Sequence, residues 1–372
     1  MLRSTRLSSG TTGSSPDAGS ARARIGAVEK TALVIGGTGQ IGIAAVSALA
    51  DAGYRVTAAH RGSTSLPGDA RADTVVLDRE DTKSLQAAAL GHDVVVDTVA
   101  YTPAHAAQLA GLAGHVGSLV VISTGTVYVG TNGSSFETAT DDDSYPEFPV
   151  PLTESSPTID DGRQTYGALK AAMERSLLAV GGLPVSILRP GAVHGPRSPK
   201  LREFYFMKRA MDGRPHVVLS RNGESRFSTS STANIAALVV ACARRPGSRV
   251  LNATDEENYS VREQAQAVFE VMGHSAAILG FDGGAIGNLG ATPWDAPRPY
   301  ACSMQRARDE VGYIPALSYT EAVRADLEWL LGEFEAGRRW QDLFPSVVLR
   351  YGEHGWFPYD DEDRWVREVS AN

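Results

Sequence analysis

A chain of 372 residues with 42% hydrophobic and 21% charged residues can form one large domain or two smaller ones with a substantial core. Its formal net charge of −8 argues against non-specific binding to nucleic acid or to anionic membrane surfaces. No apolar run approaches the roughly 20 residues that span a bilayer. The two cysteines, Cys242 and Cys302, give no disulfide framework and suit a reducing compartment, so we expect a cytoplasmic protein.

The N-terminal segment differs from the rest of the chain. Residues 1–29 are rich in Ser, Gly, Thr and Arg and contain almost no large apolar side chain. This composition predicts a disordered tail. An Arg- and Ser-rich, acid-poor start is also typical of an organelle transit peptide, which is the alternative.

Expected strands and helices alternate from Thr31 to Gly191. Short apolar runs predict buried parallel strands at 31–37, 54–60, 73–78, 93–100, 118–124 and 184–191. Helical spacing is found at 41–53, 82–92, 105–116 and 164–178. This alternation indicates βαβ units around a parallel sheet.

Beyond Gly191 the pattern becomes irregular. Helices are expected at 200–213, 232–246, 260–273 and 320–337, with a late strand at 249–254. The segment 216–230 resembles a hairpin that turns at Asn222-Gly223. From Trp340 onward the chain is dense in aromatic residues, which predicts that this segment packs against the rest of the protein.

A glycine-rich loop joins the first expected strand to the first expected helix. Gly36, Gly39 and Gly42 form the pattern G-x-x-G-x-x-G. Gly36 permits a tight turn, Gly39 lets the backbone approach a pyrophosphate, and Gly42 allows close packing of helix against strand. The helix N-terminus offers N–H groups and the positive end of its dipole to the phosphates. The loop therefore predicts a dinucleotide site.

The end of the second expected strand indicates which dinucleotide binds. An NAD site usually has an acid there that bonds the ribose hydroxyls, but this chain has Ala59, His60 and Arg61. Arg61 can pair with a 2′-phosphate, so we predict that NADP(H) is preferred, with NAD(H) as the alternative. Asp78, at the end of the third strand, either contacts the adenine amino group or caps the strand.

Tyr166 and Lys170 lie four residues apart on an expected helix and therefore share one face. Such a pair is common on solvated helices, and neither group is an acid or base near neutral pH unless its pKa is shifted. Here the pair follows the glycine loop and "VVISTGTVYVG" and precedes "LRPGAVHGP". In this order the motifs resemble the short-chain dehydrogenase/reductase superfamily, specifically its extended branch, the NAD-dependent epimerase/dehydratase family. The resemblance covers roughly residues 31–335.

The resemblance implies roles for particular residues. Tyr166 would be the general acid/base, Lys170 would bond the nicotinamide ribose and help to lower the tyrosine pKa, and Thr124 would hydrogen-bond the substrate oxygen. The implied cofactor contacts are Gly36, Gly39, Gln40, Ile41, Gly42, Arg61, Asp78, Ala100 and Lys170. The candidate substrate contacts are Ser123, an alternative to Thr124, with Thr126, His194 and Arg226.

The chain departs from the family pattern where many members bind nucleotide-sugars. Ala192 stands in place of an asparagine that touches the diphosphate in those members, and the stretch 225–236 lacks their acidic residues. Both departures argue against a nucleotide-sugar substrate. His105 and His194 are pocket candidates, although lone histidines are more often structural.

The expected fold is α/β, a Rossmann-type doubly wound parallel sheet with a smaller C-terminal substrate lobe. The expected division is a cofactor domain at 30–190 completed by about 225–255, a substrate lobe at 191–224 and 256–338, and a tryptophan-rich extension at 339–372. Ligands should bind between the lobes, at the carboxyl ends of the strands.

The expected activity is NAD(P)-dependent hydride transfer between nicotinamide and a carbinol or carbonyl carbon of a small molecule. An epimerase or dehydratase that acts through a transient ketone on a sugar-like substrate is the alternative, since the same motifs serve both. A non-catalytic NADP-sensing regulator is an alternative of another class, although such relatives typically lose the Tyr–Lys pair. We expect no metal, nucleic-acid or membrane partner, and a homodimer is a candidate assembly.

Overall fold

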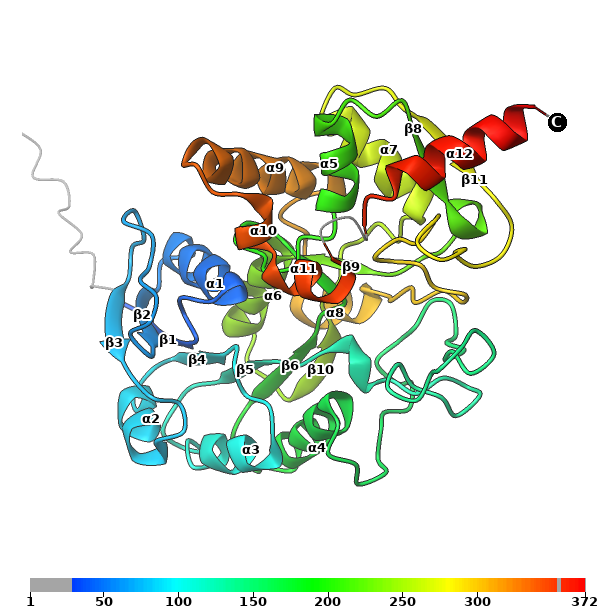
Figure 1. Ribbon diagram of the computed structural model, residues 1–372. Coiled ribbons are helices and arrows are strands. Elements are labelled where there is room, and N and C mark those ends of the chain that lie inside the picture. Colours follow the sequence, from blue (N-terminus) through cyan, green and yellow to red (C-terminus); the bar gives the residue numbers. More distant parts are fainter. Residues whose placement is uncertain (1–28, 353–355, 372) are drawn as a thin grey trace, which may run out of the picture.

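A seven-stranded parallel sheet forms the centre of the computed structural model, which describes residues 29–352 and 356–371 (Figure 1). The strand order is β10-β6-β5-β4-β1-β2-β3, and all neighbouring strands run parallel. The strands are β1 (Thr31–Ile35), β2 (Arg55–His60), β3 (Asp73–Val76), β4 (Val94–Asp97), β5 (Leu119–Ile122), β6 (Val185–Arg189) and β10 (Arg249–Asn252). The expected Rossmann-type sheet is confirmed. The expected tail, residues 1–29, lies outside the described residues except for Glu29.

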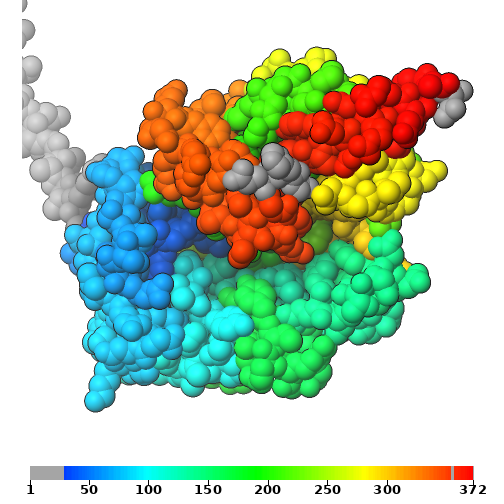
Figure 2. Space-filling model, in the orientation of Figure 1, coloured from blue at the N-terminus to red at the C-terminus, as the bar shows by residue number. Residues whose placement is uncertain are grey.

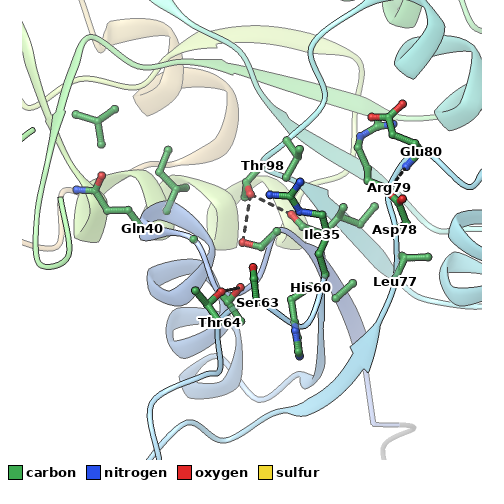
Figure 3. A pocket seen from close by; sticks show the side chains of 18 residues that line it. Ile35, Gln40, His60, Ser63, Thr64, Leu77, Asp78, Arg79, Glu80 and Thr98 are labelled. Carbon is green, nitrogen blue, oxygen red and sulfur yellow. Dashed lines mark hydrogen bonds between the residues drawn. The ribbon is translucent and has the colours of Figure 1, made fainter. Parts of the chain in front are cut away.

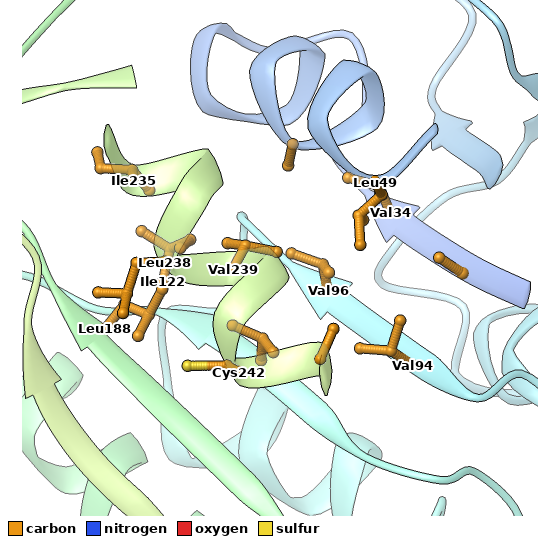
Figure 4. Packing of buried hydrophobic residues seen from close by; sticks show 14 of the residues in the cluster. Val34, Leu49, Val94, Val96, Ile122, Leu188, Ile235, Leu238, Val239 and Cys242 are labelled. Atoms are coloured by element: carbon orange, nitrogen blue, oxygen red, sulfur yellow. The ribbon is translucent and has the colours of Figure 1, made fainter. Parts of the chain in front are cut away.

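Helices cover both faces of this sheet. One face carries α1 (Gln40–Asp51), α6 (Thr232–Arg244) and α8 (Gln305–Val311), and the other carries α2 (Thr82–Ala89), α3 (Pro103–Ala110) and α4 (Tyr166–Leu178). Val96 of β4 shares a core cluster with Leu49 and Val239 from α1 and α6 (Figure 4). Val95, on the opposite side of the strand, belongs to the second cluster. Because both faces are covered, the strand has three consecutive valines before Asp97 rather than an alternating pattern.

The C-terminal half forms a second lobe above the sheet. Its elements are α5 (Phe204–Met211), β8 (His216–Leu219), α7 (Val261–Val271), β11 (Ala277–Gly280), α9 (Tyr319–Glu335), α10 (Trp340–Leu343), α11 (Pro345–Tyr351) and α12 (Tyr359–Ser370). Short strands β7 (Ala192–His194) and β9 (Thr229–Ser231) pair with each other between the sheet and this lobe. Among the described residues, no helix is long and apolar enough to cross a membrane.

The aromatic C-terminal segment packs onto this lobe, as its composition predicts. Phe204 of α5 contacts the rings of Trp340, Phe344 and Phe357 at centroid distances between 5.2 and 6.0 Å. The side chain of Phe344 is fully buried. Figure 2 shows the segment in orange and red across the upper lobe.

The expected hairpin at 216–230 is wrong. Arg221 and Asn222 do adopt left-handed conformations, with φ of 50° and 53°, in a 3-10 turn (Ser220–Gly223). The flanking strands, however, separate: β8 pairs in parallel with β11, and β9 pairs with β7. The guanidinium of Arg221, within the turn, pairs with Asp295 and Asp142. The Asn-Gly signal predicted the local turn but not its pairing partners.

Candidate active site

The glycine loop leaves β1 and enters α1 without room for side chains. Gly36 has a φ of +78°, and a Cβ there would lie 2.4 Å from Thr98 Oγ1. A Cβ on Gly42 would lie 2.1 Å from the carbonyl oxygen of Gly36, so the first turn of α1 packs directly on the loop. Gly39 is the N-cap of α1, and the first N–H groups of a helix have no intrahelical acceptor. The loop thus presents backbone donors at a positive helix end.

A cavity of about 640 Å³ opens beside this loop at the carboxyl ends of the strands (Figure 3). Of the residues expected at the cofactor, Gly36, Gly39, Gln40, Ile41, Arg61 and Asp78 line it. Gly42, Ala100 and Lys170 do not line it. Asp78 also accepts the N–H of Glu80 at 3.0 Å. It therefore lines the cavity and also caps the backbone just after β3.

Several polar cavity residues were not singled out from the sequence. Thr64 donates to the Thr38 hydroxyl at 2.8 Å, and Ser63 lies next to them (Figure 3). Arg61 is exposed, and among the described residues no carboxylate lies within ion-pairing distance of it. Arg79, by contrast, is buried and pairs with Asp97 at 3.0 Å. The cavity therefore combines the Arg61 guanidinium, which has no carboxylate partner in the described part of the chain, with neighbouring hydroxyl groups.

Lys170 lies on α4, and its side chain points toward the carboxyl ends of the central strands β4 and β5. Its Nζ donates to the carbonyl oxygens of Ala100 at 2.7 Å and Ile122 at 2.8 Å, which follow β4 and end β5. Burial lowers the pKa of Lys170 to about 8. An ammonium has three N–H groups, so one remains for a further acceptor.

Tyr166 begins α4 and is 46% exposed. Its ring stacks on Tyr101 at 5.5 Å between centroids. Partial burial raises the pKa of Tyr166, and the nearby Tyr101 and Glu137 raise it further. A hydrogen bond with Thr124 acts in the opposite direction. In the protein alone the tyrosine is therefore a protonated phenol at neutral pH.

Thr124 lies beside Tyr166, whereas Ser123 is turned into a buried network. The Thr124 Oγ1 accepts the N–H of Thr126 at 3.2 Å and lies 3.1 Å from its hydroxyl. Ser123 donates to Glu174, which is itself buried and paired with Arg189. The structure thus brings Tyr166, Lys170, Thr124 and Thr126 together and sends the Ser123 hydroxyl elsewhere.

Three further histidine and arginine candidates are engaged with carboxylates. His194 is 1% exposed and lies between Asp255 and Asp326. Arg226 pairs with Glu263 at the start of α7 at 3.0 Å. His105 Nε2 lies 3.1 Å from Glu80, and its Nδ1 accepts the N–H of Tyr101 at 2.9 Å.

Glu137 was missed by the sequence reasoning. It accepts the N–H of Gly167 at 2.7 Å and the hydroxyl of Thr165, and so holds the N-terminus of α4 where Tyr166 stands. It comes from an irregular segment, 129–160, whose sequence carries no signal for this contact.

Comparisons with known proteins agree with this architecture. The model of the "NAD dependent epimerase/dehydratase family" matches residues 32–253. A curated relative, the uncharacterized protein y4nL of Sinorhizobium fredii, is 27% identical over 206 residues, which are 48% of this chain and 56% of the relative. The chain thus spans little more than half of that relative's length.

Solved structures share the fold at low sequence identity. The UDP-N-acetylglucosamine 4-epimerase of Bacillus cereus is 18% identical with a TM-score of 0.60, covering 81% of this chain and 99% of its own. The dTDP-glucose 4,6-dehydratase of Bacillus anthracis, solved in complex with NAD, is 17% identical with a TM-score of 0.60, covering 82% and 98%. At these identities the likeness concerns the fold alone.

Proposed function

Since the chain belongs to the NAD dependent epimerase/dehydratase family, we propose that it is an NAD(P)-dependent enzyme that moves a hydride between nicotinamide and a carbinol or carbonyl carbon of a small molecule. The observation that carries the proposal is the placement of Tyr166, Lys170 and Thr124 around the ends of β4 and β5. The dinucleotide cavity lies at the same edge of the sheet, where Thr98 and Val99 line it.

The residues present fit a dinucleotide. Gly36 and Gly42 lie too close to neighbouring atoms to carry side chains. Without side chains there, the backbone N–H groups of the loop and of the start of α1 can hold a pyrophosphate. Asp78, which lines the cavity, would contact the adenine amino group, and the remaining N–H of Lys170 would bond a ribose hydroxyl. The nicotinamide supplies or accepts the hydride when bound.

We propose NADP(H) as the preferred form. Arg61 has no carboxylate partner among the described residues, and Ser63 and Thr64 follow it around the same cavity. A guanidinium flanked by hydroxyl donors suits a 2′-phosphate, whereas an acid at this place would repel one.

Tyr166 would carry the hydroxyl proton. Because its pKa is raised in the protein alone, its phenol can donate a proton to a carbonyl oxygen during reduction. In the oxidation direction the phenolate takes the proton back from the substrate hydroxyl. Thr124 would hold the same oxygen by a hydrogen bond, so that the proton transfer occurs at a fixed position.

Epimerisation or dehydration through a transient ketone is the second candidate, favoured by the family to which the chain belongs. The same residues serve it, because epimerisation and dehydration through a ketone both begin with oxidation of a carbinol, one direction of the same hydride transfer. A small-molecule substrate between the lobes, a cytoplasmic location and a homodimer complete the proposal. The two buried free cysteines, Cys242 and Cys302, are consistent with a reducing compartment.

Two measurements test the function. Mass spectrometry of the nucleotide that copurifies with the protein should find NADP(H) or NAD(H). A panel of small ketones, aldehydes and secondary alcohols, followed by nicotinamide absorbance, should then reveal a substrate. If the protein binds neither NADP(H) nor NAD(H) when either nucleotide is supplied at millimolar concentration, the proposal is wrong.

A further inference from the structure

A buried histidine and three carboxylates meet where the sheet joins the C-terminal lobe. His194 lies on β7, Glu203 precedes α5, Asp326 lies in α9 and Asp255 follows β10. None of the four is more than 1% exposed. Three regions distant in sequence, 194–203, 255 and 326, thus bring one imidazole and three acids into a space closed to solvent.

Asp255 is satisfied on both oxygens. Its Oδ1 accepts the N–H of Ser231 and the side-chain amide of Asn234, both at 2.9 Å. Its Oδ2 accepts the Thr229 hydroxyl at 2.7 Å and lies 3.0 Å from His194 Nε2. An ionised Asp255 holds a ring proton on Nε2, so a metal ion would bind at Nδ1, in place of the proton that otherwise lies between Nδ1 and Asp326. Histidines that bind metal ions usually have such a carboxylate on the far side of the ring.

The Nδ1 side of the ring is less well satisfied. His194 Nδ1 is 2.8 Å from Asp326 Oδ2, and one ligand atom each from His194, Glu203 and Asp326 lie within 4.8 Å of one another. Two oxygens of this group, Asp326 Oδ1 and Glu203 Oε2, are buried without a hydrogen-bond partner. A buried carboxylate oxygen without a partner costs free energy, and a cation removes that cost.

The charges of the cluster also fit a divalent ion. Burial lowers the pKa of His194, but the carboxylates of Glu203 and Asp326 outweigh it and raise that pKa well above 6.5. Without an ion, a proton on His194 and the guanidinium of Arg202 beside Glu203 thus offset two of the three carboxylate charges. A divalent cation that replaces this proton would, together with Arg202, offset all three. Buried charge of one sign is otherwise expensive.

We propose that His194 Nδ1, Glu203 and Asp326 bind a divalent transition-metal ion such as Zn²⁺ or Mn²⁺, with Asp255 orienting the imidazole. One imidazole and two carboxylates are donors that these ions accept. Because the cluster is closed to solvent, the ion is structural and enters during folding.

The position of the cluster indicates what the ion would stabilise. It joins β7 to α5 and α9 of the C-terminal lobe. Val193, next to His194, lines the dinucleotide cavity, and the Gln40 side-chain amide donates to the carbonyl oxygen of Gly195 at 3.2 Å. The ion would therefore hold the two lobes together next to the phosphate loop. This inference stands apart from the proposed reaction.

Refolding of the full-length protein, free of any polyhistidine tag, tests the proposal. Denatured protein is refolded with EDTA, with Zn²⁺ or with Mn²⁺, dialysed and analysed for metal and for Tm. We expect about one equivalent of one of these ions per chain and a Tm that is higher with the ion than with the chelator. Wild-type protein that binds neither ion and has the same Tm in all three samples would overturn the proposal, because protons then neutralise the cluster.

Variants locate the ion. Glu203→Gln and Asp326→Asn keep the shape of each side chain, and both should lose the bound equivalent. Glu154→Gln is the matched control, since Glu154 is a half-buried acid outside the cluster that accepts the N–H of Asn252, and it should retain the ion. If the double variant Glu203→Gln/Asp326→Asn keeps its equivalent, the ion binds elsewhere and the assignment is wrong.

Discussion

Lys170 Nζ lies 2.7 Å from the carbonyl oxygen of Ala100, a residue 70 positions earlier in the chain. The contact joins the middle of α4 to the loop after β4. It places an ammonium group at the carboxyl ends of the central strands β4 and β5, beside the dinucleotide cavity. Because the ammonium is buried, its charged form is disfavoured and the pKa of Lys170 falls to about 8.

This lowered pKa predicts a pH dependence of stability. Between pH 8 and the usual lysine pKa of about 10.4 the unfolded chain binds more protons than the folded one, so stability rises with pH. Relative to Lys170→Met, the free energy of unfolding of the wild type should increase by about 1 to 3 kcal/mol over that range. Urea unfolding at several pH values measures the difference. A difference that is flat or decreases with pH would rule out a buried, destabilised ammonium.

The exposed guanidinium of Arg61 should select the cofactor. The wild type should bind NADPH more tightly than NADH, and Arg61→Asp should reverse the order because its carboxylate repels the 2′-phosphate. Arg71→Asp is the control, since Arg71 lies away from the cavity and pairs with Asp51. Fluorescence titration with both nucleotides gives the two Kd values. Equal affinities in the unmodified protein would defeat this prediction.

Gly42 should tolerate no side chain. The Cβ of Gly42→Ala would press on the backbone carbonyl of Gly36, so we expect a loss of stability of about 1 to 3 kcal/mol and weaker dinucleotide binding. Gly332 also lies in a helix, but a Cβ there meets nothing within 4 Å. Gly332→Ala should therefore be neutral or stabilising by up to about 1 kcal/mol. Thermal unfolding of both variants compares them, and equal effects would contradict the close packing of loop and helix.

The C-terminal helix should depend on a buried ion pair. Arg209 and Glu362 are fully buried and lie 2.6 Å apart. Glu362→Gln leaves the guanidinium without a counter-charge, and we expect a loss of about 3 to 5 kcal/mol. Asp360→Asn, on the exposed side of the same helix, should change stability by less than about 0.5 kcal/mol. Denaturant unfolding would count against the claim if the two variants behaved alike.

The sequence predicted those parts of the fold that local patterns determine. The three consecutive valines of β4 identify a strand buried on both faces, and the glycine spacing at 36–42 identifies the loop before α1. The hairpin prediction failed because strand pairing is non-local: Asn222 favours a turn, but nothing nearby in sequence shows that β8 pairs with β11.

The candidate site follows the same rule. Tyr166 and Lys170 were singled out as candidates because their spacing places them on one helix face and because the neighbouring motifs resemble a known family; the spacing alone is common on solvated helices. Glu137, which holds the start of α4, could not be found, because it comes from an irregular segment. The contact of His194 with Asp326 joins residues 132 positions apart, and no local pattern encodes it.

The central claim is that Tyr166 transfers the substrate proton, and one comparison tests it most directly. With a substrate found in the panel, kcat of Tyr166→Phe should fall by roughly 10²–10⁴, the usual contribution of a positioned acid or base. The Kd for NADPH should hardly change, since the ring remains in place against Tyr101. Tyr101→Phe is the matched control and should keep most of the activity. If Tyr166→Phe retains full turnover on that substrate, the assignment of Tyr166 is wrong.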